Sequence, residues 1–520
     1  MVKSTLPPLI QELCNPSLHG SQTVGVRVVE THISWVLLTG KTAYKIKKPV
    51  NFGFLDFSTL ALRQRFCQEE LRLNRRLAPF LYEAVVAITG KPGQIGFDGI
   101  GPALEYAVKM KQFDESSLAD RLLEQNRLTP AQIDVLAQTL ADFHGKADCA
   151  EANDPHGGPK KILAAAEHNF DHLLRLCGDR AELLNDLLSW TRAEFARLSE
   201  VFQARKNAGF VRECHGDLHS GNLVLIGGIL VPFDCIEFSE DLRWIDCMNE
   251  IAFLFMDIDE RGCRYLAWRL LNRNIELSGD YPGLQILKFY CVYRALVRAK
   301  VAALSLEQAA DPDEQSRLKV QCHRYLDYAL DTIQQKAPIL LITHGFSGSG
   351  KSTVAKALSE RLPAIRIGSD IQRKRLAGLD AQDRSQSKLQ HGIYSPAMTR
   401  NTYGLLLRHA EILLQSGFNV LLDATYLVSE NRRQCRELAN RLGVRFVILD
   451  FRASEAVLSS RIAERLVRGD DPSEASQEVL ALQAAKANPL QAEEIPFTLA
   501  IDTSGGVDID EILLAAGIGD

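Results

Sequence analysis

The sequence lacks the local signals of a secreted, membrane-spanning or zinc-ribbon protein. Its 11 cysteines are scattered singly, and no two have the CxxC spacing of a zinc ribbon or a thioredoxin-like site. Unpaired thiols at this density favour a reducing compartment. The first residues contain no uninterrupted apolar stretch of the signal-peptide type, and no apolar run approaches the ~20 residues that a membrane span requires. We therefore expect a cytoplasmic protein with no membrane partner.

A strong charge of either sign is also absent, because 60 basic and 65 acidic residues leave a net charge of −5. This excludes a generally basic surface for nucleic acid, although it leaves room for a local basic groove. What is present is a chain of 520 residues, 46% of them hydrophobic and 24% charged. At ~150 residues per domain, such a chain forms about two to four domains with buried cores.

The N-terminal part of the chain alternates between strand-like and helix-like patterns. Residues 31–48 predict two strands joined by a turn at Thr39-Gly40-Lys41, because β-branched and aromatic residues flank the glycine. A helix is expected from about Ser58 to Leu77, with Ser58 or Thr59 as N-cap, and a further strand over 103–110. Helical spacing dominates 130–201, a strand-rich patch follows at 210–238, and helices continue to about residue 335.

The pattern changes near residue 337. Beyond it, short and nearly continuous apolar runs alternate with helical stretches, as is typical of parallel strands that are buried on both faces. We therefore predict an α/β protein of two domains, 1–337 and 338–520, the second built on a parallel sheet of βα units.

The second domain opens with a phosphate-binding loop. Residues 345–352 match GxxxxGK[ST], follow an apolar strand and precede a helix, which is the context that the motif requires. Its glycines let backbone N–H groups surround phosphate oxygens, and the helix N-terminus favours negative charge. Lys351 is expected to reach the β- and γ-phosphates and Ser352 to hold Mg²⁺. The expected ATP-binding residues are Gly345, Ser347, Gly348, Ser349, Gly350, Lys351, Ser352 and Thr353.

Two carboxylates follow later strands of this domain. Asp370 ends the run AIRIGSD, and Asp423 ends NVLLDAT. Ligands of open α/β sheets bind at the carboxyl ends of strands, so both acids should face the phosphate site. One such acid usually supports the metal, and the other accepts a proton from the attacking hydroxyl. The alternative is that each simply caps a helix.

Three arginines could add positive charge to this site. Arg373 lies three residues after Asp370, on the same helical face. Arg461 and Arg465 are spaced to share one face of a later helix, which could close over the phosphates as a lid. A solvated charged face is the alternative for each of them.

The second domain resembles the small P-loop kinases. Its strand-end Ser-Asp-x-x-Arg is similar to that of zeta toxins, chloramphenicol phosphotransferase and polynucleotide 5′-kinases. The resemblance implies that Asp370 is the catalytic base, that Arg373 contacts substrate or phosphate, and that Arg461 and Arg465 belong to the lid. Asp423 is then the expected metal ligand.

The first domain contains a separate constellation for phosphoryl transfer. In the run His215-Gly-Asp217-Leu-His219-Ser-Gly-Asn222, an aspartate and an asparagine are separated by four residues, and Asp234 ends the following apolar run. Asp217 suits the deprotonation of an acceptor hydroxyl, and Asn222 and Asp234 suit the holding of Mg²⁺. His215 is open to a structural role, and His219 to a structural or a catalytic one.

This constellation resembles the aminoglycoside phosphotransferase-like branch of the protein-kinase fold, which has HGDxxxxN followed by (I/F)DxE, here Phe233-Asp234-Cys-Ile-Glu237. The resemblance implies structural roles for Asp246 and His144. It also implies a strand lysine for the α- and β-phosphates, for which we choose Lys45, with Lys47 as the alternative.

The same resemblance implies a helix glutamate that holds the strand lysine. Glu69 and Glu70 both lie in the expected helix, and we choose Glu70. The strand Leu104–Val108 is a candidate for the hinge whose backbone bonds adenine. No GxGxxG precedes the lysine, and exposed lysines on an edge strand are the alternative to the kinase assignment.

The order of the two domains resembles bacterial proteins described as bifunctional aminoglycoside phosphotransferase/ATP-binding proteins. That resemblance implies two ATP·Mg²⁺ sites, each of which phosphorylates a hydroxyl of a small molecule. Two other hypotheses remain open: one domain is a nucleotide-sensing module, or the second is a polynucleotide 5′-hydroxyl kinase. The basic run Arg373-Lys374-Arg375 is compatible with the latter.

Overall fold

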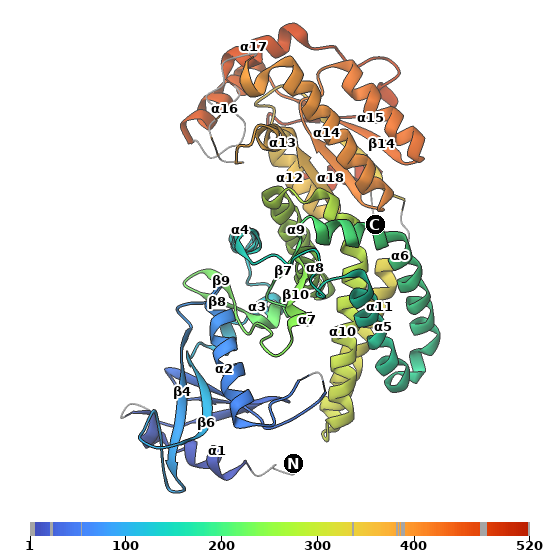
Figure 1. The fold of residues 1–520 in the computed structure, drawn as a ribbon. Coiled ribbons are helices and arrows are strands. Elements are labelled where there is room, and N and C mark those ends of the chain that lie inside the picture. The colour runs from blue at the N-terminus through green and yellow to red at the C-terminus, as the bar shows by residue number, and fades with distance from the viewer. Residues whose placement is uncertain are drawn as a thin grey trace. The chain divides into compact units, whose positions relative to one another are not determined.

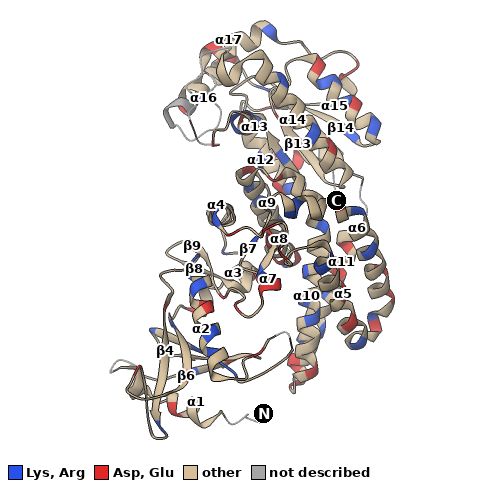
Figure 2. Ribbon diagram, in the orientation of Figure 1, with Lys and Arg blue, Asp and Glu red and all other residues tan. Residues whose placement is uncertain are grey.

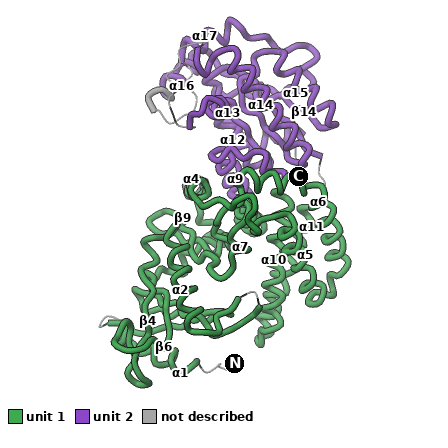
Figure 3. The backbone as a smooth tube through the Cα atoms, in the orientation of Figure 1, with its two compact units in different colours: residues 1–263, 286–333 green, residues 264–285, 334–520 purple. Residues whose placement is uncertain are grey.

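The computed structural model describes residues 6–20, 24–53, 55–334, 337–380, 383, 385, 391–468 and 476–517, with backbone alone for 465–468. The chain forms two compact units (Figure 3). The first unit contains Met1–Cys263 and Ile286–Ile333, and the second contains Arg264–Gln285 and Gln334–Asp520. The predicted boundary between residues 337 and 338 stays a prediction.

The first unit begins with an antiparallel sheet of six strands in the order β1-β2-β3-β6-β4-β5. The expected turn at Thr39-Gly40-Lys41 joins β2 and β3, and Thr59 caps the helix α2 by accepting a hydrogen bond from Leu62 N. The sheet and its helices are visible at the blue end of the chain in Figure 1. Their bounds are β1 Arg27–Glu30, β2 Ser34–Leu38, β3 Thr42–Lys47, β4 Tyr82–Lys91, β5 Gln94–Phe97, β6 Ala103–Lys111, α1 Pro8–Leu13 and α2 Leu60–Asn74.

The remainder of the first unit is mainly helical, with two short antiparallel ladders, β7 with β10 and β8 with β9. The ladders carry the loop that contains Asp217 and Asn222. The first unit therefore has a sheet-rich part and a helix-rich part. The bounds are α3 Ala119–Glu124, α4 Pro130–Lys146, α5 Pro159–Leu176, α6 Ala181–Asn207, β7 Val211–Glu213, β8 Leu223–Ile226, β9 Ile229–Pro232, α7 Glu240–Arg243, β10 Trp244–Asp246, α8 Cys247–Glu260, α10 Leu287–Gln308 and α11 Pro312–Ile333.

The second unit is a parallel sheet of five strands in the order β12-β13-β11-β14-β15, as the apolar runs predict. Its strands are buried on both faces because helices cover them, and Leu341, Leu421 and Leu449 lie in its core. The bounds are β11 Ile339–His344, α12 Lys351–Arg361, β12 Ala364–Gly368, α13 Ser369–Leu376, α14 Pro396–Gln415, β13 Asn419–Asp423, α15 Ser429–Leu442, β14 Arg445–Arg452, α16 Glu455–Arg468, α17 Gln477–Lys486, β15 Thr498–Asp502 and α18 Ile509–Ala515.

The helix α9, Arg264–Ser278, also belongs to the second unit, although it precedes that unit's sheet in the sequence. Asn272 accepts a hydrogen bond from Arg366 N at 2.8 Å and donates one to Ala364 O at 2.9 Å. Both partners lie on β12, which is an edge strand of the sheet. An unpaired edge exposes backbone groups that can pair with another chain, so α9 satisfies part of this edge.

Among the described residues, none of the helices combines the length and the hydropathy that crossing a membrane requires. The 11 cysteines are all free thiols, and most of them are buried.

Candidate active sites

Lys45 lies at the centre of the first candidate site. Strand β3 places it beside α2 and beside the end of β9, so that its Nζ atom is 2.9 Å from Glu70 Oε1 and 2.5 Å from Asp234 Oδ1. Burial alone would lower the pKa of Lys45, but Asp234 and Glu70 raise it well above its usual range. Lys45 is thus a charged amine held next to a carboxylate that is 40% exposed.

Lys47 shares this face of β3 because side chains alternate along a strand. It is fully buried, and its Nζ atom contacts Glu70 at 2.7 Å and also Glu237. Glu70 therefore bridges two lysines, of which only Lys45 also contacts Asp234. The other expected alternative, Glu69, pairs instead with Arg72 on the surface of α2.

Asp217 and Asn222 lie together in the loop between β7 and β8. The Asn222 amide donates to Asp217 Oδ2 at 3.1 Å and to Asp217 O at 3.0 Å. Both hydrogen bonds are donated by Nδ2, so the Oδ1 atom of Asn222 can accept a hydrogen bond or coordinate a metal ion. Together with the Asp234 carboxylate, it offers the hard oxygen donors that Mg²⁺ prefers, and the residues present fit that ion.

Two histidines hold this loop. His215 donates from Nε2 to Phe233 O at 2.9 Å and accepts from Asp217 N at Nδ1, so its role in the structure is to support the backbone. His219 lies 3.6 Å from Asp217 Oδ2, and Arg298 lies 3.4 Å from His219. Burial alone would raise the pKa of Asp217, but His219 and Arg298 lower it below its usual range. Asp217 is thus ionised at neutral pH.

Helix α8 and its neighbours anchor the same loop through buried carboxylates. Glu250 accepts from Gly216 N at 2.8 Å and contacts His144 Nε2 at 2.7 Å. Asp257 accepts from Ser220 N at 2.9 Å. His144 is therefore a structural partner of the loop, and Asp246 caps α8 and pairs with Arg205.

The expectation that Leu104–Val108 forms a hinge is wrong. These residues lie inside β6, which pairs with β3 on one side and β4 on the other. Glu105 and Tyr106 pair with β4, and Ala107 and Val108 pair with both neighbouring strands, so the sheet uses most of this backbone. The first backbone outside the sheet is the connector after Lys111, where Phe113 packs against Phe233 with ring centroids 5.1 Å apart.

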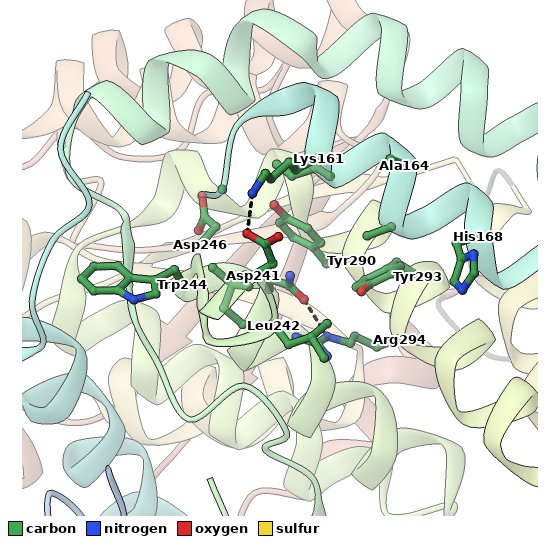
Figure 4. Close-up of a pocket in the computed structure, with 15 residues that line it drawn as sticks. Lys161, Ala164, His168, Asp241, Leu242, Trp244, Asp246, Tyr290, Tyr293 and Arg294 are labelled. Atoms are coloured by element: carbon green, nitrogen blue, oxygen red, sulfur yellow. Dashed lines mark hydrogen bonds and ion pairs between the residues drawn. The ribbon is translucent and has the colours of Figure 1, made fainter. Parts of the chain in front are cut away.

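A cavity of about 400 Å³ is lined by residues of α5, α7, β10, α8 and α10. Figure 4 shows Trp244, Tyr290 and Tyr293 around it, with Lys161 reaching Asp241 at 2.6 Å. Arg294 also lines the cavity and donates to Gly216 O at 3.2 Å, one residue before Asp217. An aromatic cavity with a few charged groups is typical of a small-molecule site.

The second candidate site is built around the loop between β11 and α12. Its glycines have positive φ at 345, 348 and 350. A Cβ atom at Gly345 would lie 2.5 Å from Phe451 O, and one at Gly348 would lie 2.7 Å from Leu458 O. Only glycine therefore allows this loop to curl against its neighbours. The loop lines a cavity of about 940 Å³.

Asp423 lies beside this loop, at the end of the neighbouring strand β13. Ser352 Oγ donates to Asp423 Oδ1 at 3.2 Å, and Arg366 donates to Asp423 Oδ2 at 2.7 Å. The hydroxyl and the carboxylate are oxygen donors of the kind that Mg²⁺ prefers, so they fit that ion. Arg366 also forms an ion pair with Glu276 of α9, at 3.0 Å. It belongs to no sequence motif, so the sequence did not predict its place in the site.

Asp370 and Arg373 face the same cavity from α13. Arg373 lies 3.2 Å from Asp370 Oδ1 and stacks over Tyr394. Asp370 makes no side-chain cap to α13, so the helix-cap alternative is not what the structure contains. Lys351 donates to Phe346 O at 2.6 Å within the loop.

The expectation that Arg461 and Arg465 belong to a lid stays a prediction. Arg461 lies against the loop, 2.5 Å from Thr503 O and 3.5 Å from Gly348 O. The Arg465 side chain lies outside the described residues. Gln483 was missed by sequence reasoning, yet it accepts from Ser347 N at 3.0 Å and donates to Ser347 Oγ at 3.0 Å. No residue pattern marks it, because its position depends on how α17 folds over the loop.

Basic and acidic positions are interspersed in both units, as Figure 2 shows. The three consecutive basic residues on α13 do not form a separate basic patch, because each of them is paired or buried within the second unit. Arg373 pairs with Asp370, Lys374 is buried, and Arg375 donates to Glu276 O at 2.8 Å. The run is therefore not a free basic surface.

Comparisons with known proteins find similarity to both parts of the sequence. A family model described as an AAA domain matches residues 340–490. A gluconokinase from Sinorhizobium meliloti is 22% identical and covers 35% of this chain and 91% of its own, with a TM-score of 0.25. An ethanolamine kinase from Plasmodium vivax is 10% identical and covers 59% of this chain and 82% of its own, with a TM-score of 0.37.

Whole-chain relatives are found in mycobacteria. Uncharacterized proteins from Mycobacterium tuberculosis and Mycobacterium bovis are each 30% identical over 470 residues, which is 89% of this chain and 90% of theirs. The chain therefore belongs to the family of these mycobacterial proteins.

Proposed function

We propose that this protein has two ATP- and Mg²⁺-dependent phosphotransferase centres, each of which transfers the γ-phosphoryl group to a hydroxyl of a small molecule. One observation carries the proposal. In the first unit, segments that are far apart in the sequence bring together two groups of residues: Lys45, Glu70 and Asp234, and next to them Asp217 and Asn222. Packing alone does not require such a set, because buried charges are costly unless they serve a purpose or are paired.

In the first centre, the residues divide the work of phosphoryl transfer. Asp217 orients the acceptor hydroxyl and takes its proton, for which its ionised state is required. Lys45 holds nucleotide phosphates, and Glu70 fixes the direction of the lysine. Asn222 and Asp234 are the residues that would hold Mg²⁺, which supplies charge neutralisation at the phosphates when bound.

The acceptor of the first centre is assigned to the cavity of Figure 4. Arg294 lines this cavity and also donates a hydrogen bond to Gly216 O, directly before Asp217, which links the cavity wall to the catalytic loop. The aromatic rings of Trp244, Tyr290 and Tyr293 favour a compact organic alcohol over a polymer.

In the second centre, the loop around Lys351 would hold the phosphates of ATP, and Ser352 with Asp423 would hold Mg²⁺. Asp370 is the proposed base, Arg373 the proposed contact of substrate or phosphate, and Arg461 a positive charge at the loop. The engaged basic run on α13 favours a small-molecule acceptor over a polynucleotide.

The experiment is phosphoryl transfer from labelled ATP into a metabolite extract by the full-length chain. We expect new phosphorylated species, one set lost in Asp217→Asn and another in Asp370→Asn, with rates lowered about 10²–10⁴-fold. Asp186→Asn on α6 and Glu437→Gln on α15 are matched controls, because both side chains are exposed and distant in sequence from either motif.

A nucleotide-sensing role for one unit predicts a different result. In that case the corresponding aspartate variant would leave every phosphorylated species unchanged while ATP still binds. Loss of no species in either variant would contradict both proposed centres.

A further inference from the structure

A cluster of soft metal-binding side chains lies behind the catalytic loop of the first unit. A ring nitrogen of His144 and the Sγ atoms of Cys214 and Cys247 all lie within 4.8 Å of one another. They come from three elements: α4, the residue that follows β7, and the first residue of α8. The three residues are far apart in the sequence, so no CxxC motif indicates the cluster.

We propose that His144, Cys214 and Cys247 bind a zinc ion. Zinc takes imidazole nitrogen and thiolate sulfur in tetrahedral geometry, and in that geometry the donors lie about 3.5–4 Å apart. The donors of this cluster are within roughly 1 Å of that spacing, which side-chain rotation can supply. Three protein donors leave a fourth coordination position for water.

The surroundings of the cluster favour a metal in two ways. Cys214 is fully buried and His144 nearly so, and two thiolates with one neutral imidazole cancel the charge of a divalent zinc ion, which makes the complex compatible with burial. Zinc-binding histidines usually give their second ring N–H to a carboxylate. Glu250 already contacts His144 Nε2 at 2.7 Å, which leaves Nδ1 to the metal.

The site would also brace the catalytic loop. Cys214 directly precedes His215, Gly216 and Asp217, and Glu250 holds Gly216 N from the same helix that supplies Cys247. A zinc ion would therefore tie the start of this loop to α4 and α8. Binding releases the protons of the two thiols, because thiolates are the ligands.

The test measures metal in the full-length chain, purified with reductant, without chelator and with any affinity tag removed. We expect about one zinc per chain in the wild type, and a loss of roughly tenfold or more in Cys214→Ala and Cys247→Ala. Cys291→Ala is the matched control, because Cys291 is buried in α10 outside the cluster. Glu250→Gln should weaken zinc affinity about 10–100-fold.

Cobalt substitution identifies the ligands independently of activity. Co²⁺ bound by thiolates gives a charge-transfer absorption that oxygen ligands at the phosphate sites do not give. We expect this absorption in the wild type and in Cys291→Ala but not in Cys247→Ala. Cys247 is half-buried, so its replacement disturbs packing less than that of the buried Cys214. The proposal is overturned if the wild type takes up no zinc, if it shows no such absorption with Co²⁺, or if the absorption persists in Cys247→Ala.

Discussion

At the residue scale, two lysines that a sequence motif does not distinguish have different surroundings. Lys45 and Lys47 lie on the same face of β3 and both contact Glu70. Lys45 also forms an ion pair with Asp234, which is partly exposed. Lys47 instead forms its second ion pair with Glu237, and Lys47 is fully buried. The first is placed to meet a ligand, and the second holds two buried carboxylates.

This difference predicts opposite effects for matched substitutions. Lys45→Met should lower kcat/KM of the first centre about 10²–10³-fold with little loss of stability, because Glu70 keeps Lys47 as a partner. Lys47→Met should lower the free energy of unfolding by about 3–5 kcal/mol, because it leaves buried carboxylates unpaired. Steady-state kinetics and urea unfolding on each variant measure the two effects. Equal losses of stability would contradict the assignment.

The candidate residues could be predicted from the sequence where a motif fixes their spacing. The loop at 345–352 and the run from His215 to Asn222 are of this kind, because the chemistry sits within a few residues of one turn. Arg366, Gln483, Glu250 and Arg298 could not be predicted, because each meets its partner only after distant elements pack together. The hinge was misplaced because an apolar run does not show which of its backbone groups a sheet will use.

At the element scale, the phosphate loop depends on glycine at Gly348. Gly348→Ala would place a Cβ atom 2.7 Å from Leu458 O at a φ of +83°. We expect the second centre to lose ATP affinity and the second unit to lose about 1–3 kcal/mol of stability. Calorimetric titration with ATP and thermal unfolding measure both. Gly506→Ala is the control, since its Cβ would meet open space; an unchanged ATP affinity in Gly348→Ala would contradict the expectation.

Helix α9 gives a second prediction at this scale. Asn272→Ala removes both hydrogen bonds to the edge strand β12. The second unit should lose about 1–3 kcal/mol of stability, because the freed backbone groups of β12 lose their partners, and the chain should aggregate more readily. Urea unfolding and light scattering are the measurements, with Asn185→Ala on α6 as control. A variant as stable and as monodisperse as the control would exclude this role for α9.

At the scale of the whole molecule, the two candidate sites lie in different compact units. Every residue of the Lys45 site belongs to the first unit, and every residue of the Lys351 site belongs to the second. The parallel sheet could be foreseen from five apolar runs, because buried strands leave an almost continuous signal in the sequence. The membership of α9 could not be foreseen, because an amphipathic helix does not show which core it will cover.

Separate sites predict separate nucleotide binding. Calorimetric titration should detect two ATP sites in the wild type and one in Lys351→Ala, with phosphoryl transfer at the first centre retained. Lys45→Met should preserve the site of the second unit. If Lys351→Ala abolishes binding at both sites, the two sites are not independent and the assignment to separate units fails. Lys356→Ala on α12, whose side chain lies outside the loop motif, is the control.

The placement of α9 has a consequence for biosynthesis. A ribosome delivers this helix before it has made α10, α11 or any strand of the sheet whose edge Asn272 bonds. The apolar side of α9 therefore has no sheet to cover until the later strands have been synthesised. For the same reason, a single cut between residues 337 and 338 would separate α9 from its sheet, so the two halves cannot be exchanged between genes as simple modules.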